Sequence, residues 1–123
     1  MKSYTTLKQS KKLAEKLPRE SADMRYVRAY FEGKNSDWFI QLGRAIKSDD
    51  VIPAWSLAAL INALPRSVKF KDDEYYLRFM KDYVEYANDE VSLTGIFLHT
   101  TGNNNLVDAC YEMVIQLKEN GLI

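Results

Sequence analysis

Apolar residues return at helical spacing in three segments of the chain, and residues that start or stop a helix border each segment. Near the C-terminus, Asn105 can cap the segment and Gly121 lies just beyond its end. The apolar stripe between them consists of Leu106, Val107, Cys110, Met113, Val114 and Leu117. We therefore expect a helix over 105–119.

The two other helical segments are shorter. In the middle of the chain, Ser56 can act as an N-cap and Pro65 stops the helix, and the apolar residues between them fall at i, i+3, i+4 and i+7. Near the N-terminus, Thr5 or Thr6 can cap a helix that ends before Pro18, although its apolar stripe is narrow. We expect helices over 56–64 and 5–17.

Alternation of side chains predicts strands between the first two helices. Over Arg25 to Phe31, Tyr26, Arg28 and Tyr30 point to one side and the intervening residues to the other. A turn is expected at residues 32–35, followed by a second strand over Trp38 to Leu42. Pro53 is expected to break the chain before the middle helix.

Residues 68–101 fit two structures. Their apolar residues have a helical period: Tyr75, Tyr76, Phe79, Met80, Tyr83, Val84 and Ala87. The abundance of aromatic residues favours strands instead, with a turn at Lys81-Asp82, a return strand over Tyr83 to Tyr86 and a third strand over Leu93 to His99. The residues alone leave a helix and a hairpin equally open.

Three segments, QSKKLAEKLPRESADMRYV, IPAWSLAALINALP and NLVDACYEMVIQLKENGLI, resemble small uncharacterised proteins of Bacteroides-type gut bacteria and their prophages. The resemblance covers nearly the whole chain and implies no activity, ligand or catalytic residue. It implies a strand-like stretch between the middle and last helices and a phage or mobile-element origin. The expected fold is then a single α+β domain over 1–123, with a small antiparallel sheet (a meander at about 68–100 plus one or two earlier strands) packed with about three helices.

Composition narrows the functional classes. The 123 residues suit one domain, and 17 basic side chains balance 17 acidic ones, which disfavours strong attraction to nucleic acid through net charge. Residues 1–50 nevertheless carry 11 Lys and Arg against 7 Asp and Glu, and the remaining residues carry 6 against 10. The single cysteine and the polar N-terminus predict a cytoplasmic protein without a membrane span.

The chain offers little that could support catalysis or bind a metal. Cys110 lies on an apolar helix stripe, where a thiol is inert, and His99 is expected at a strand end on the surface. The acidic runs at 49–50 and 72–74 lack the spacing of a calcium loop. Residues 100–105 could cradle an anion but have no phosphate-binding motif, so helix capping is the better interpretation. We expect no metal and no cofactor.

Aromatic and basic side chains give the candidate interaction surface: Tyr26, Arg28, Tyr30, Trp38 and Trp55. Tyr26, Arg28 and Tyr30 have the chemistry of a base-stacking platform, and tryptophans often anchor interfaces. Three functions follow as hypotheses. The favoured one is a non-enzymatic protein-interaction or accessory domain, which binds an unknown protein or a second copy of itself through an unprotected sheet edge or an exposed tryptophan. The alternatives are a nucleic-acid-binding module using the basic N-terminal half and an enzyme using dispersed carboxylates.

Overall fold

The computed structural model describes residues 2–30, 37–81, 83–88, 96–101 and 105–123. These residues form helices, one short 3-10 turn (η1) and two antiparallel sheets. In chain order the elements are α1 (Leu7–Ala14), η1 (Arg19–Ser21), β1 (Met24–Ala29), β2 (Asp37–Leu42), β3 (Val51–Ala54), α2 (Leu57–Ala63), β4 (Ser67–Phe70), β5 (Asp73–Phe79), β6 (Val84–Ala87), β7 (Ile96–Thr100) and α3 (Leu106–Glu119). The predicted α+β class is confirmed.

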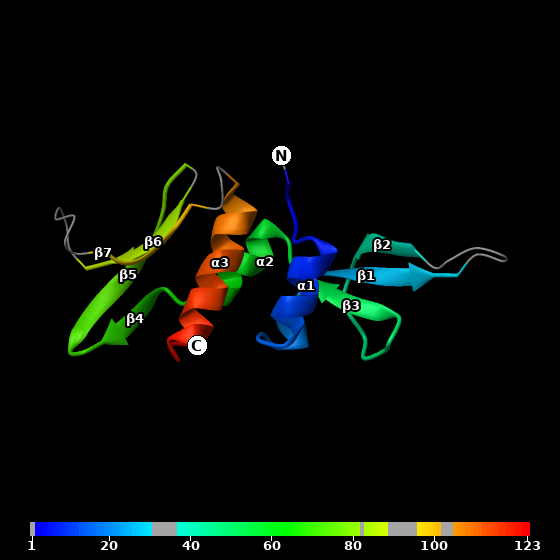
Figure 1. The fold of residues 1–123 in the computed structure, drawn as a ribbon, viewed down its shortest axis with the longest axis horizontal. Helices are drawn as coiled ribbons and strands as arrows, with labels where there is room; N and C mark the ends of the chain where they lie inside the picture. The colour runs from blue at the N-terminus through cyan, green and yellow to red at the C-terminus, as the bar shows by residue number, and fades with distance from the viewer. Residues whose placement is uncertain (1, 31–36, 82, 89–95, 102–104) are drawn as a thin grey trace.

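The molecule is elongated, with one sheet at each end and the helices between them (Figure 1). One sheet has the strand order β2-β1-β3, and the other has the order β4-β5-β6-β7. The predicted earlier strands therefore belong to a sheet of their own and do not extend the meander. No helix in the described part of the chain is long and apolar enough to cross a membrane.

The predicted capping residues start all three α-helices. Thr6 caps α1 in a capping box with Gln9, in which each side chain meets the other residue's backbone N–H. Ser56 accepts from the backbone N–H of Ala59 at the start of α2, and Asn105 accepts from two backbone N–H groups of α3. The first helix is shorter than predicted and ends at Ala14.

The second sheet is the predicted meander, with one strand more than expected. Each of its strands pairs antiparallel with the next along the chain, so residues 75–79 and 84–87 are strands and not one helix. The additional strand β4 joins β5 through Lys71 and Asp72, which both have positive φ (51° and 68°). Positive φ at both central positions is the conformation that two-residue hairpins use and that most L-residues avoid.

Replacing Lys71 and Asp72 together with Asn and Gly is therefore expected to stabilise the protein, because this pair adopts positive φ at little cost. The strain at Lys71 costs about 1–2 kcal/mol, whereas Asp tolerates positive φ better, so the free energy of unfolding should rise by about 1–2 kcal/mol in urea titration. Ala63→Gly, which makes an Asn-Gly pair with Asn62 in the last turn of α2, is the control and should destabilise. A hairpin variant no more stable than the wild type would contradict the strain.

Pro53 does not break the chain before α2, contrary to the sequence expectation; it lies within the edge strand β3. The backbone N–H of Arg28 donates to the carbonyl of Asp50 at 2.8 Å, which makes this a hydrogen-bonded antiparallel pair. Hydrogen-bonded and non-hydrogen-bonded pairs alternate along an antiparallel ladder. The backbone N–H and C=O groups of Ile52 and Ala54 therefore also point towards β1, and the backbone nitrogen and carbonyl of Pro53 point away from it. The missing N–H of Pro53 thus lies on the outer edge, where the sheet needs no donor.

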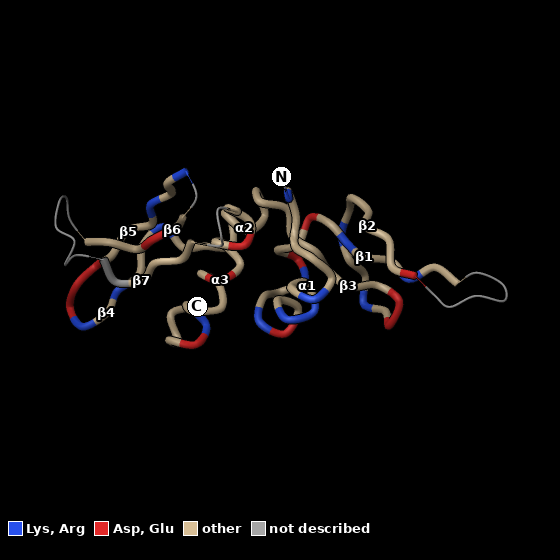
Figure 2. The backbone as a smooth tube through the Cα atoms, turned by 45° about the horizontal axis from the view of Figure 1, so that its top comes forward, with Lys and Arg blue, Asp and Glu red and all other residues tan. Residues whose placement is uncertain are grey.

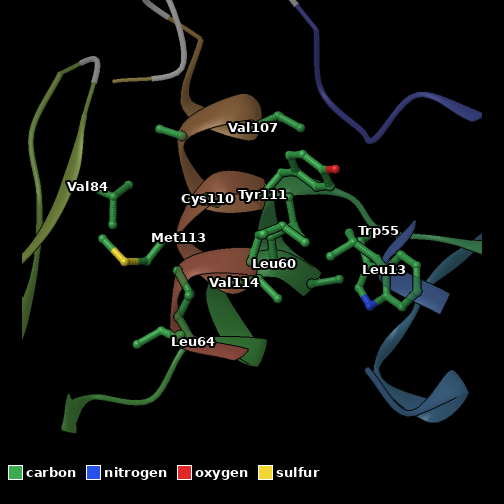
Figure 3. Packing of buried hydrophobic residues seen from close by; sticks show 14 of the residues in the cluster. Leu13, Trp55, Leu60, Leu64, Val84, Val107, Cys110, Tyr111, Met113 and Val114 are labelled. Carbon is green, nitrogen blue, oxygen red and sulfur yellow. The ribbon is translucent and has the colours of Figure 1, made fainter. Parts of the chain in front are cut away.

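A cluster of buried apolar side chains runs through the middle of the molecule and reaches from α1 to the second sheet. Helix α3 is its centre. Figure 3 shows Met113 extending from α3 towards Val84 of β6, while Leu60, Trp55 and Leu13 pack on the other side. Of the residues predicted for the α3 stripe, Leu106 is partly buried and the other five are buried, and Ala109, Tyr111 and Ile115 widen the buried face.

Polar contacts join the N-terminal segment to the rest of the chain. Thr5 is fully buried; its hydroxyl bonds Ser10 at 2.7 Å and accepts from the backbone N–H of Trp55 at 3.1 Å. Lys2 and Gln9 both donate to the carboxylate of Asp108 on α3. Because all of these polar groups find partners, the segment lies against α3 and β3 without a buried unpaired donor.

Candidate interaction surface

A cation–aromatic cluster lies where β1 and β2 face each other. The register places Arg28 directly opposite Trp38, and the Arg28 guanidinium carbon lies 4.5 Å from the centre of the Trp38 ring. Arg28 also donates to the hydroxyl of Tyr30 at 3.3 Å, and that hydroxyl donates to Asp50 at 2.8 Å. Arg28 Nε is 3.8 Å from Asp50, so the carboxylate neutralises part of its charge. These contacts hold Arg28 in one position.

Lysines of α1 extend the cluster. Lys11 lies 6.0 Å from the Trp38 ring centre, and the exposed Lys8, three residues before it, is its neighbour on the same helical face. Figure 2 shows the Lys positions along α1 beside the three-stranded sheet. The surface thus combines an aromatic centre, Trp38 and Tyr30, with a cationic margin. We call it the Trp38 surface and define it by Lys11, Arg28, Tyr30, Trp38 and Asp50.

The structure brings only three of the five predicted surface residues together: Arg28, Tyr30 and Trp38. Tyr26 lies on the same face of β1, but it is half-buried and its hydroxyl donates to the carbonyl of Thr5 at 2.8 Å. Burial and the neighbouring Tyr4 raise the pKa of Tyr26. Tyr26 therefore supports the N-terminal segment and is not an open stacking platform.

Trp55 was wrongly placed on this surface, because it has no exposed area. Its indole Nε1–H donates to the Ser21 hydroxyl at 2.9 Å, which satisfies the one polar group of the ring inside the core. Lys11 and Asp50 were not predicted as members. No local pattern places Lys11 beside Trp38, since that contact depends on how α1 packs on the sheet.

Cys110 and His99 lie where the sequence predicted them. Cys110 is fully buried on α3, and burial raises the pKa of its thiol to about 12, so it is not a nucleophile at neutral pH. His99 is exposed on β7, with its ring 4.7 Å from that of Tyr83. The residues lie on different elements, and no hydrogen bond between the two side chains is present.

A cleft of about 530 Å³ lies between α3 and the end of β7. Asp108 and Glu112 line it together with His99. Burial acts to raise the pKa of Asp108. The hydrogen bond and positive charge of Lys2 and the hydrogen bond from Gln9 act in the opposite direction, and the pKa is lowered overall. Asp108 is thus a weak base engaged in anchoring the N-terminal segment, a poor choice for proton transfer.

Single residues of the acidic runs and of residues 100–105 have structural partners. Glu74 of the acidic run accepts from the Ser67 hydroxyl at 2.9 Å, and Asp50 belongs to the Trp38 surface. Asn105 caps α3, as predicted, while residues 102–104 of the proposed anion loop lie outside the described residues. Within the described ranges, no three His, Cys, Asp or Glu side chains gather as metal ligands would.

No protein-family model, curated protein or solved structure matches the chain. The resemblance to small proteins of gut bacteria and their prophages stays a prediction. What the chain does has to be inferred from its own residues.

Proposed function

We propose that the chain is a protein-interaction domain whose contact site is the Trp38 surface. The observation that carries the proposal is the position of Arg28, held 4.5 Å over Trp38 by Tyr30 and Asp50. Tryptophan, tyrosine and arginine are the residues most enriched where alanine substitution weakens protein complexes most. A side chain already fixed in position loses little entropy on binding, which favours such a site.

The charges of the Trp38 surface indicate the kind of partner. Lys11 and its neighbour Lys8 on α1 are exposed beside it, and acidic side chains on a partner would complement them. Charge complementarity of this sort raises association rates and excludes wrong partners more than it raises affinity. We therefore expect a partner that places an apolar or aromatic group on Trp38 and Tyr30 and carboxylates opposite α1.

Nucleic acid is the second candidate, and the cluster geometry favours it less. Base stacking needs an open aromatic face. In this structure the Arg28 guanidinium covers a face of Trp38, and Tyr26 is engaged with the N-terminal segment. Asp50 also places a negative charge within the cluster, where a phosphate backbone would have to pass.

The test is affinity capture with Arg28→Ala as bait, beside the wild type, in an extract of the source cells. A protein captured by the wild type should be lost with this variant, and the affinity for the purified partner should fall about 30-fold or more, as for an interface hot spot. Arg66→Ala, which removes an exposed arginine near the other sheet, is the matched control and should capture the partner normally.

Two outcomes would contradict the proposal. A partner that binds Arg28→Ala as tightly as the wild type would place the contact site elsewhere. Binding of a fluorescent single-stranded oligonucleotide that depends on Arg28 and falls steeply between about 50 and 200 mM salt would support the nucleic-acid function instead.

A further inference from the structure

Strand β2 is an apolar sheet edge. Its sequence from Asp37 to Leu42 has one charged residue and no proline, lysine or glycine, whereas the opposite edge β3 has Pro53. Edge strands in soluble proteins usually carry such protective residues because an open edge pairs with other chains. Leu42 is 80% exposed and Phe39 45%, and Ile46, just beyond the strand, is 64% exposed. The edge therefore has the composition of a strand that pairs on its outer side.

The backbone of β2 shows which groups are directed outwards. The N–H of Gly43 donates to the carbonyl of Asp23 at 3.0 Å, which continues the β1–β2 register as a hydrogen-bonded pair. Hydrogen-bonded and non-hydrogen-bonded pairs alternate along an antiparallel ladder, and this register has no bulge. Trp38, Ile40 and Leu42 therefore direct their N–H and C=O groups away from β1.

These three residues form a self-complementary set. If two copies of β2 run antiparallel with the two Ile40 residues opposite each other, Trp38 of one copy lies opposite Leu42 of the other. All outward N–H and C=O groups of the three residues then meet in hydrogen-bonded pairs, each exchanging two bonds. On one face Leu42 packs on Trp38 of the second copy, and Ile40 packs on Ile40. This arrangement covers Leu42, which among the described residues has the most exposed large hydrophobic side chain.

Charges at the strand ends agree with the same register. Asp37, at the start of β2, comes to lie opposite Gly43 of the second copy. The Arg25 guanidinium lies beside Gly43 on the sheet face to which Asp37 also belongs, 3.7 Å from the place that a β-carbon on Gly43 would take. The twofold arrangement thus places a carboxylate near a guanidinium at both ends of the pair, and like charges do not meet.

We propose that the protein forms a symmetric dimer in which β2 pairs antiparallel with β2 of a second copy, with Ile40 on the twofold axis. The two sheets join into one sheet of six strands, twice the three of each chain. A second copy is the occupant because the edge complements itself in backbone groups, apolar side chains and charge. The dimer does not rest on the proposed function, since no partner protein takes part in its formation.

The mass of the isolated chain in solution tests the dimer. Sedimentation equilibrium of the wild type should give twice the 14.2 kDa of one chain. Leu42→Lys should raise the dissociation constant at least about tenfold, because two buried leucines are lost and lysines would face Trp38. Ile46→Lys, at an exposed apolar residue outside the pairing, should leave it unchanged. A wild type that stays at 14.2 kDa at about 1 mM, or a dimer insensitive to Leu42→Lys, overturns the proposal.

Disulfide formation tests the register. Phe39 and Gln41 of the second copy form a non-hydrogen-bonded pair in the proposed dimer, with Cα atoms about 4.5 Å apart, a separation that a disulfide spans. Mixed Phe39→Cys and Gln41→Cys chains should crosslink on oxidation, while either variant alone should not. The buried Cys110 does not compete. Crosslinking of Phe39→Cys with itself in place of the mixture overturns the register, and therefore the proposal.

Discussion

Replacing Trp55 with alanine is expected to lower the free energy of unfolding by about 3–5 kcal/mol, the loss typical of a fully buried tryptophan. Trp55 has no exposed area and packs between α1 and α2, so its removal leaves a cavity at the junction of the two halves of the molecule. The Ser21 hydroxyl also loses the indole N–H that donates to it. Urea titration followed by circular dichroism measures the change.

The matched control is Trp38→Ala. Trp38 is half-buried, and its substitution loses the contact with Arg28, worth about 0.5–1 kcal/mol, and only part of the apolar burial that Trp55 has, so it should cost clearly less than Trp55→Ala. Equal losses at the two tryptophans would contradict the burial difference and would return Trp55 to the list of surface candidates.

The protein is expected to lose stability steeply in alkali, beginning near pH 9. Burial raises the pKa of the Cys110 thiol from 9.0 to about 12, so between these values the thiol ionises in the unfolded chain but not in the folded one. The unfolded state then binds fewer protons, and its relative stability rises with pH. This one group should lower the free energy of unfolding by about 1.4 kcal/mol per pH unit in that window, as measured by urea titrations at successive pH values.

Cys110→Ala isolates this effect. The variant loses the thiol, so the slope between pH 9 and 12 should become shallower although its stability at pH 7 is lower. Part of the slope remains, since burial also raises the pKa of Tyr86 and of Tyr111. An unchanged slope, or rapid reaction of the folded wild type with a thiol reagent at neutral pH, would contradict the burial of an intact thiol.

The parts of the fold that the sequence predicted well depend on local interactions. Thr6, Ser56 and Asn105 each satisfy backbone N–H groups within the next few residues, so a helix start can be identified without knowing the tertiary structure. Residues 75–87 fitted a helix by spacing, yet their pairing with β4, β7 and each other makes strands. Strand formation here depends on pairing with other strands, and the spacing of apolar residues within one segment does not reveal such pairing.

Long-range packing also explains what was missed. Pro53 was expected to break the chain because the sequence shows that it has no backbone N–H. The sequence does not show that the nitrogen of Pro53 points to the outer edge of the sheet, where no donor is needed. Trp38 and Trp55 looked alike as sequence features. Only the packing of α1 and η1 distinguishes them, since it buries Trp55 and leaves Trp38 on the surface beside Lys11.

The outward-facing nitrogen of Pro53 limits how far the first sheet can grow. Pro53 is buried, and a strand arriving at β3 would find no N–H donor at that position. If β2 joins two chains, both remaining edges of the joint sheet are β3 strands, each with its proline. Growth of the first sheet by edge pairing would then end at two chains.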